Sequence, residues 1–411
     1  MPSAKPATAA PGDVLIAGGV GSSLRSLASA ELFDPSTRQF IATGSSAQSR
    51  AGAGAAALST APSTATVLLD GGFSGTAAIK HFSLGLDGNV LASAEVFDAA
   101  SGAFSPLGAM LTPRLGFSAT ALGNGKVLVA GGLDNSGNVL ETAELYDPVA
   151  RKFVAVNNPM SDRRIFHTAT LLPNGKVLLA GGATNLSGDT SSSADLFDPA
   201  TNTFTSATTQ MDHQRAAHTA TLLTTGPLAG GVLITGGGGG AGMFLKDSSA
   251  EVYDPALQQF VLLPSFLGEP RSMHTATILD DGSVLIVGGF DGSAVISGGV
   301  LSSASGLTSN SAELFDPKTL EFSCVGGFNN SLLRCNQSMA VARAGHTATI
   351  LTTGPKQHRV LIAGGVGGTN PEAAGVPLSS AEIFDPANGG SFSLAGSMST
   401  PRVFHTATPL H

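Results

Sequence analysis

Short apolar or alternating runs recur along the whole chain, and each is bounded by Gly, Pro, Asn or Asp. The copy that follows Arg164 shows the pattern clearly, with runs at 167–172, 176–180, 193–197 and 203–206. Runs of four to six residues between turn residues predict strands, not helices. The first two runs are separated by Asn174-Gly175, a dipeptide typical of tight hairpins. The copy therefore predicts four antiparallel strands in series.

Four markers fix the register of this unit. An arginine precedes strand one, at Arg50, Arg114, Arg164, Arg215, Arg271, Arg343 and Arg402. A Gly-Gly pair ends strand two, at 18–19, 71–72, 131–132, 181–182, 236–237, 288–289 and 364–365. An acidic residue lies in strand three, at Glu31, Glu95, Glu144, Asp195, Glu251, Glu313 and Glu382. A phenylalanine marks strand four, at Phe40, Phe104, Phe153, Phe204, Phe260, Phe322 and Phe392.

The repeat is broken at the two ends of the chain. Residues 402–410 open a unit that does not continue, and residues 14–19 continue a unit that has no opening. Four antiparallel strands at a period near 50 residues describe one propeller blade. We therefore predict an all-β, seven-bladed propeller over residues 13–411, with the C-terminal strand paired to the N-terminal blade. Residues 1–12 are expected to form a flexible lead.

These markers resemble the kelch repeat, in the bacterial form with His-Thr-Ala-Thr openings. The resemblance covers about residues 13–410. One difference is that the chain has no Trp, so that strand four carries Phe at the position where kelch repeats usually have Trp. It implies a closed ring of seven blades. Some kelch propellers are copper radical oxidases resembling galactose oxidase, which need tyrosine ligands. The only two tyrosines, Tyr146 and Tyr253, occupy the core aromatic register before Asp, so this activity is not expected.

The long connections point to one face. In a blade, the connection from strand two to strand three and the connection to the next blade emerge on the same side. The longest of these lie at 73–93, 290–311, 323–342 and 366–380. Long loops in a compact domain are more often functional than not. We predict that this face binds the ligand, with the seven marker arginines as a rim around the channel mouth. The alternative is that each arginine is a structural latch within its blade.

Five histidines share the third position after the marker arginine, namely His167, His218, His274, His346 and His405. A ring of imidazoles could bind a metal, but a residue repeated in blade after blade favours a structural role, buried between blades and bonded to backbone or an acid. No metal or cofactor is expected. The strand-three acids must likewise have partners, because an unpaired buried carboxylate is costly. The glycine run 236–240 lacks the Lys-Ser/Thr of a phosphate loop, and 134–138 does not match a calcium loop.

The composition of the chain limits which kinds of partner and which cellular compartment are expected. The net charge of −8 disfavours nucleic acid, and no apolar run reaches the length of a membrane span. The two cysteines, Cys324 and Cys335, lie in one insertion, which favours a disulfide over a metal site and hence an oxidising, extracytoplasmic compartment. The N-terminus lacks the apolar centre of a signal peptide.

The leading hypothesis is a non-catalytic, monomeric, extracytoplasmic propeller that binds a protein or glycan ligand. The absence of Trp and the scarcity of Tyr remove the usual stacking platforms for sugars, which favours a protein or acidic ligand. The first alternative is a small-sugar isomerase or lyase, similar to the sialic acid mutarotases, which an acidic residue outside the repeat register in a pocket at the channel mouth would favour. The second is a structural module of a surface assembly.

Overall fold

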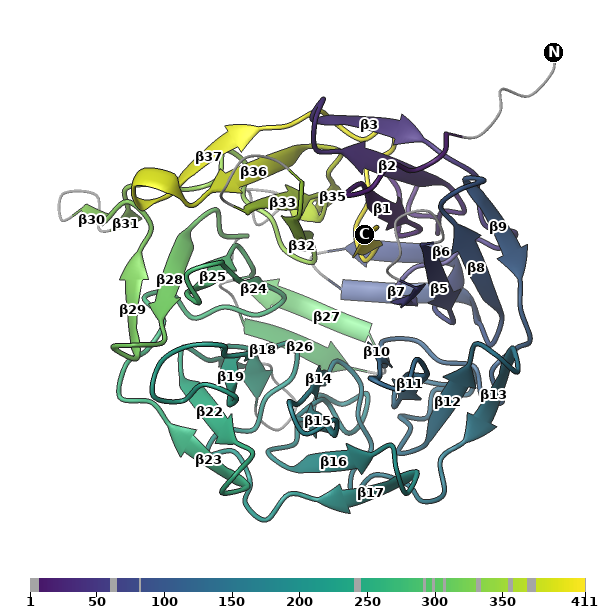
Figure 1. Cartoon of the computed structure of the whole chain (residues 1–411), viewed down its shortest axis with the longest axis horizontal. Coiled ribbons are helices and arrows are strands. Elements are labelled where there is room, and N and C mark those ends of the chain that lie inside the picture. The colour runs from purple at the N-terminus through teal and green to yellow at the C-terminus, as the bar shows by residue number, and fades with distance from the viewer. Residues whose placement is uncertain are drawn as a thin grey trace.

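In the computed structural model, seven four-stranded antiparallel sheets form a closed ring around a central channel (Figure 1). The structure describes residues 7–59, 65–80, 83–239, 245–290, 293–297, 300–305, 308–329, 334–353, 358–367 and 375–410. Within these ranges there is one 3-10 turn, η1 (Ala387–Gly389), and no helix long and apolar enough to span a membrane. Ala7 and Ala9, in the segment expected to be a flexible lead, form hydrogen bonds to Thr43 and Ala99.

The strands are listed from the channel outward. Blade 1 contains β38 (Thr406–Pro409), β1 (Val14–Ala17), β2 (Ala30–Asp34) and β3 (Gln39–Ala42). Blade 2 contains β4 (Gly54–Ser59), β5 (Thr66–Asp70), β8 (Ala94–Asp98) and β9 (Ala103–Pro106). Blade 3 contains β10 (Ser118–Ala121), β11 (Val127–Ala130), β12 (Ala143–Asp147) and β13 (Lys152–Ala155). Blade 4 contains β14 (Thr168–Leu171), β15 (Val177–Ala180), β16 (Ala194–Asp198) and β17 (Thr203–Ser206).

The remaining three blades follow the same order. Blade 5 contains β18 (Thr219–Leu222), β19 (Val232–Thr235), β22 (Ala250–Asp254) and β23 (Gln259–Leu262). Blade 6 contains β24 (Thr275–Ile278), β25 (Val284–Val287), β28 (Ala312–Asp316) and β29 (Glu321–Cys324). Blade 7 contains β32 (Thr347–Leu351), β33 (Arg359–Ala363), β36 (Ala381–Asp385) and β37 (Ser391–Leu394). The four strands predicted for the copy after Arg164 agree with those of blade 4 to within one residue.

The ring closes where the sequence predicted. Strand β38 pairs antiparallel with β1, with Val14 opposite Pro409 and Ala17 opposite Thr406. Blade 1 therefore contains three strands from one end of the chain and one from the other. The marker Arg402 bonds Glu31 at 2.9 Å, which joins the same two segments through side chains.

The core lies between neighbouring blades. Leu128 and Leu145 of blade 3 pack with Leu179 and Phe197 of blade 4, and the other blade pairs form equivalent apolar clusters. Within each blade the strand-three aromatic contacts the strand-four phenylalanine. In blade 4 the ring centroids of Phe197 and Phe204 are 5.2 Å apart. Tyr146 and Tyr253 occupy this same buried register, as predicted.

The Gly-Gly pairs let adjacent blades approach closely. In blade 4 Gly181 has φ 63° and Gly182 has φ 101°, and a Cβ on Gly181 would lie 2.5 Å from the Arg215 carbonyl oxygen of blade 5. The Gly182 N–H donates to that same carbonyl at 2.8 Å. Only glycine combines this conformation with this contact at no steric cost.

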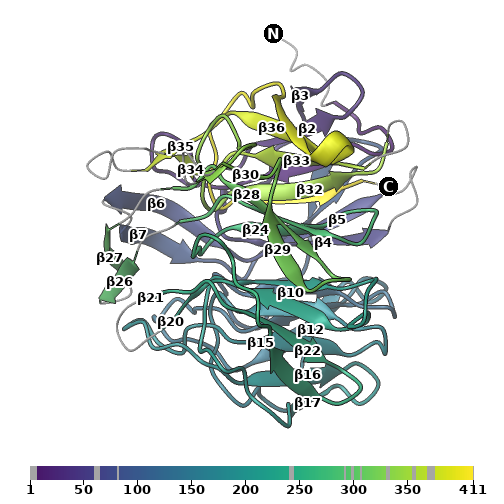
Figure 2. The same ribbon diagram turned by 90° about the vertical axis from the view of Figure 1, so that its left-hand side faces the viewer.

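Extra two-stranded sheets project from one face of the ring. They are β6 (Phe73–Lys80) with β7 (Ser83–Val90), β20 (Gly238–Gly239) with β21 (Leu245–Lys246), β26 (Ser293–Ser297) with β27 (Val300–Ser305), and β34 (Val366–Gly367) with β35 (Val376–Pro377). All four lie on the left of Figure 2. A fifth, β30 (Phe328–Asn329) with β31 (Arg334–Cys335), lies at the outer edge beside β29 (Figure 1). We call β6–β7 and β26–β27 the cap hairpins.

Candidate functional site

The marker arginines are not a binding rim. All seven side chains are fully buried, with 0% exposure, and each guanidinium points into its own blade. Arg164 donates to the carbonyl oxygens of Gly181 and Ser193, to the Ser193 hydroxyl, and to Asp195 at 2.7 Å. The prediction that Arg50, Arg114, Arg164, Arg215, Arg271, Arg343 and Arg402 contact a ligand is therefore wrong for this structure. The latch alternative describes the observed contacts.

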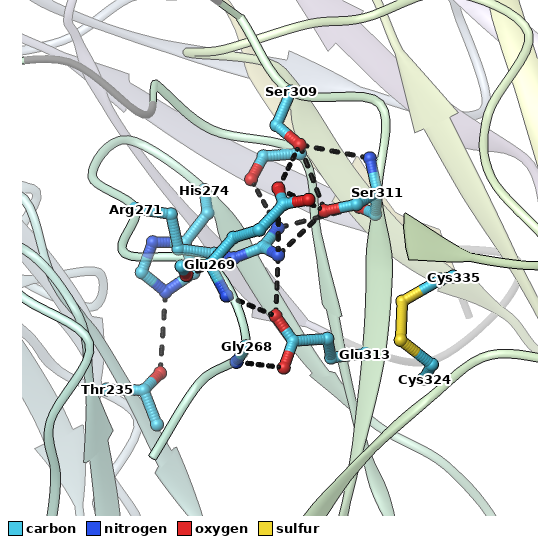
Figure 3. Close-up of polar contacts among 11 residues, drawn as sticks. Thr235, Gly268, Glu269, Arg271, His274, Ser309, Ser311, Glu313, Cys324 and Cys335 are labelled. Atoms are coloured by element: carbon cyan, nitrogen blue, oxygen red, sulfur yellow. Dashed lines mark hydrogen bonds and ion pairs between the residues drawn. A yellow bond between two sulfur atoms is a disulfide. The ribbon is translucent and has the colours of Figure 1, made fainter. Parts of the chain in front are cut away.

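Figure 3 shows the latch of blade 6. Arg271 bonds Glu313 at 2.7 Å and the Ser311 hydroxyl at 2.8 Å. The second carboxylate oxygen of Glu313 accepts the N–H of Gly268 at 2.7 Å, which fixes the segment that enters the blade. The buried acid is thus satisfied by one guanidinium and one backbone segment. The same pattern of an arginine paired with the strand-three acid occurs in all seven blades, as an unpaired buried charge would require.

The repeated histidines link neighbouring blades. Nε2 of His167, His218, His274, His346 and His405 bonds a hydroxyl of the preceding blade, from Ser118, Thr168, Thr219, Thr275 and Thr347 respectively, at 2.9–3.0 Å. The expected burial between blades is confirmed, and the partner of each Nε2 is a hydroxyl group, which the prediction did not include. Burial, reinforced by the nearby Arg271, lowers the pKa of His274 to about 3, so this imidazole is neutral at physiological pH.

The channel mouth is a cavity of about 350 Å³. Each blade contributes to its wall the second and third residues after its marker arginine. These pairs are Gly52-Ala53, Gly116-Phe117, Phe166-His167, Ala217-His218, Met273-His274, Gly345-His346 and Phe404-His405. Because strand one begins on the side where strand two ends, this mouth opens on the face that carries the cap hairpins. Strand β7 lies beside β27 there (Figures 1 and 2).

The first residue of each pair has a left-handed backbone. Glycine provides it at Gly52, Gly116 and Gly345, whereas Phe166, Ala217, Met273 and Phe404 adopt φ of 52–56°. A non-glycine residue in this region costs about 1–3 kcal/mol. Since glycine satisfies the fold in three blades, the four side chains are retained at a cost in stability. Three of them are large and apolar, and they give the mouth an apolar wall.

Backbone hydrogen bonds connect these positions around the ring. The N–H of Ala217 donates to the Phe166 carbonyl, the N–H of Met273 donates to the Ala217 carbonyl, and three further blades continue the series with Gly345, Phe404 and Gly52. The N–H of Phe166 donates to Gly116 in the same way. The mouth is therefore bounded by a nearly continuous hydrogen-bonded ring, which holds its shape independently of side chains.

One acidic residue at the mouth lies outside the repeat. Asp70 precedes the Gly-Gly pair of blade 2, where the other blades have Ala17, Ala130, Ala180, Thr235, Val287 and Ala363. Its carboxyl group is fully buried, and neither oxygen has a hydrogen-bond partner among the described residues. Burial, only partly offset by Arg50 and Arg114, raises the pKa of Asp70 to about 7. Sequence reasoning overlooked this residue, although an acid before Gly-Gly in a single blade was a visible signal.

Two further predictions concern local features. Cys324 and Cys335 form the predicted disulfide, which closes the hairpin connection beside β29. The oxygen-rich segment 134–138 is organised by Asp134, whose carboxylate accepts the N–H groups of Ser136 and Asn138 at 2.8 Å. Gly240, the last residue of the glycine run, and parts of the long connections at 290–311, 323–342 and 366–380 lie outside the described residues.

Comparison with known proteins agrees with this architecture. The kelch motif family matches residues 113–160, which cover blade 3. No curated protein matches the sequence significantly. The solved structure entitled "Structure of YjhT" is similar in fold, with a TM-score of 0.56 and 13% identity over 84% of this chain and 97% of that one. At this identity the similarity concerns the fold alone. The chain is therefore a seven-bladed β-propeller that contains a kelch motif in blade 3, and the markers of that blade recur in the other six.

Proposed function

We propose that this propeller is a non-catalytic binding protein that holds a segment of a partner protein at the channel mouth, beneath and beside the cap hairpins. The observation that carries the proposal is the apolar wall of the mouth, where Phe166, Met273 and Phe404 are retained in a strained backbone conformation. Backbone conformations of this kind cluster at active sites and ligand clamps. A protein segment could place one aromatic or aliphatic side chain in the cavity, in the manner of interface hot spots.

The buried arginines change the expected ligand chemistry. A rim of seven guanidiniums would suit an acidic ligand, but these groups are all used inside the blades. An apolar anchor fits the wall better than a carboxylate does. A glycan fits less well, because the described mouth residues include phenylalanines but no Trp or Tyr to stack on sugar rings.

A second candidate function is a small-sugar isomerase or lyase acting at the same mouth. One observation favours it, namely that Asp70 is an acid outside the repeat register and has a raised pKa, as a general acid would need. However, Asp70 is not among the residues that line the cavity. Binding is therefore the better supported function.

The test is selection of binders from a displayed random-peptide library on the immobilised protein. Ala217→Phe should weaken the selected peptides at least tenfold, because phenylalanine fits this register in two other blades and would fill the cavity. The control is Leu257→Phe, an exposed site in the turn between β22 and β23, which should leave binding unchanged. Peptides without an apolar anchor, or peptides that bind the Ala217→Phe variant equally well, would exclude the mouth as the site.

We also propose an extracytoplasmic location, supported by the Cys324–Cys335 disulfide, since such bonds form and persist in oxidising compartments. Rapid alkylation of thiols in intact cells of the source organism, followed by mass measurement of the protein, tests this. Two alkylated cysteines in the native protein would contradict it.

A further inference from the structure

Three kinds of polar link join neighbouring blades. The first is the ring of backbone bonds at the mouth, and the second is the bond from a histidine to a hydroxyl of the preceding blade. The third lies at the outer edge, where the segment after strand four meets the strand-three turn of the next blade. Gly44 N–H, for example, donates to the Gly102 carbonyl at 2.9 Å, and Gly396 N–H donates to the Arg38 carbonyl. Each kind recurs at most of the seven seams.

The seam between blades 2 and 3 lacks all three kinds. Among the described residues, no bond joins Gly52 to Gly116 at the mouth or Gly108 to Arg151 at the outer edge. At this seam Gly54 occupies the position of the hydroxyl residue, and Phe117 occupies the position that is a histidine at most other seams. Other bonds still cross this seam: the Gly72 N–H donates to the Arg114 carbonyl, the Arg114 N–H to the Leu91 carbonyl, and the Val90 N–H to Asn135 Oδ1. In the connecting segment, Leu111 and Thr112 donate to the Glu144 carboxylate, as the equivalent segments do at other seams.

Asp70 lies at this same seam. It is opposite Gly54 in the sheet, and any side chain at Gly54 would overlap its carboxylate oxygen. The same added side chain would also meet Phe117 and Ala119 of blade 3, so Gly54 and Asp70 lie against that blade. The charged groups around it are Arg50, which bonds Glu95 at 2.7 Å, and Arg114, which bonds Glu144 at 3.0 Å. Both guanidiniums are thus already paired, and the carboxyl group has no partner of its own.

Blade 2 also carries half of the cap. Strand β6 begins at Phe73, three residues after Asp70, and its partner β7 lies beside β27 across the channel mouth. A displacement of blade 2 from blade 3 would therefore shift the β6–β7 hairpin and change access to the cavity.

We propose that the seam between blades 2 and 3 is the gate of the channel-mouth site, and that the protonated carboxyl group of Asp70 keeps it closed. The proposal rests on the proposed function for its purpose, but the movement itself can be tested without a ligand. Ionisation of Asp70 in its apolar surroundings is costly while the seam is closed, and opening hydrates the carboxylate. The fraction of molecules in which the seam is open should therefore rise with pH. It should level off above about pH 7, because Asp70 is then ionised even while the seam is closed.

The experiment measures how fast a cysteine in the cavity reacts with N-ethylmaleimide. Ala217→Cys places a thiol in the wall, and Val149→Cys, at a position that is 94% exposed, is the reference that corrects for the pH dependence of the reagent. The two native cysteines form a disulfide and do not react. The ratio of the two labelling rates should rise by up to about tenfold per pH unit between pH 5 and 7, then become constant.

Asp70→Ala, which installs the residue found in four other blades, should abolish this rise, and Asp70→Asn provides the same test if the alanine variant does not fold. The combination Gly54→Thr, Asp70→Ala and Phe117→His restores the histidine–hydroxyl link and should lower the ratio at every pH. A ratio that does not change with pH in the parent, or a rise that persists in both Asp70 variants, would overturn the gate. Failure of peptide selection with a normal pH response would overturn only the proposed function.

Discussion

Two adjacent arginines allow the latch to be tested against a matched control. Arg164 is fully buried and bonds Asp195 at 2.7 Å, whereas Arg163 has 60% of its side chain exposed and contacts the half-exposed Glu141 at 3.3 Å. Mutating either one to alanine removes one positive charge from the same segment. The two changes differ mainly in what the lost guanidinium leaves behind.

Arg164→Ala leaves the buried Asp195 without its cation and also removes donors from the Gly181 and Ser193 carbonyls. Breaking a buried pair in this way costs about 3–5 kcal/mol. Arg163→Ala should cost about 0–1 kcal/mol, because an exposed pair is screened by water and salt. The unfolding free energies of the two variants should therefore differ by roughly 3 kcal/mol or more.

Equilibrium unfolding in urea, followed by circular dichroism, measures the difference. The slope with denaturant must stay unchanged for the comparison to hold, since a ring of seven blades can depart from two-state behaviour. Equal midpoints for Arg163→Ala and Arg164→Ala would refute the latch. A conservative variant, Arg164→Lys, should fall between them, because lysine keeps the charge but loses the planar arrangement of donors.

Three further predictions concern other parts of the ring. Deleting residues 402–411 should lower the melting temperature in a thermal scan, because β1 loses its inner partner; an unchanged value would refute the closure. Asp70→Ala should raise the unfolding free energy at pH 8 by up to about 4 kcal/mol, because the folded-state pKa of Asp70, about 7, lies above the ordinary 3.8, and the stability of the parent falls as pH rises between those values. The gain should vanish near pH 4. An alanine variant that is less stable than the parent at pH 8 would contradict this. Replacing both cysteines by alanine should cost about 3 kcal/mol or less in a denaturant titration, given the short loop they close; a loss above roughly 5 kcal/mol would mean that the disulfide supports more than its own hairpin.

The repeat made most of the fold predictable. Seven copies of each marker fix the strand order, the number of blades and the terminal closure, because a marker that recurs at one register must occupy one structural position. The face that bears the long connections also followed from strand alternation. That β7 would lie beside β27 could not be predicted, since it depends on how two hairpins from distant blades lean across the channel.

The site was predicted less well, and the arginines show why. Their position before the innermost strand suggested the channel mouth, but the Arg164 side chain points into its own blade and donates to the Gly181 carbonyl. A signal was available in the sequence, because each blade has one marker arginine and one strand-three acid, and a buried acid requires a cation. Asp70 shows the opposite case, in which the one departure from the repeat carried the information.

The strand exchange in blade 1 also has a consequence for synthesis on the ribosome. Residues 14–17 are made early, but their inner partner, residues 406–409, is made only after the rest of the ring. At about 5–20 residues per second, the edge of β1 stays unpaired for roughly 20–80 s. Its apolar sequence, Val-Leu-Ile-Ala, would meanwhile be open to association with other chains. The blade that seals the finished ring is therefore the one most in need of protection by chaperones during translation.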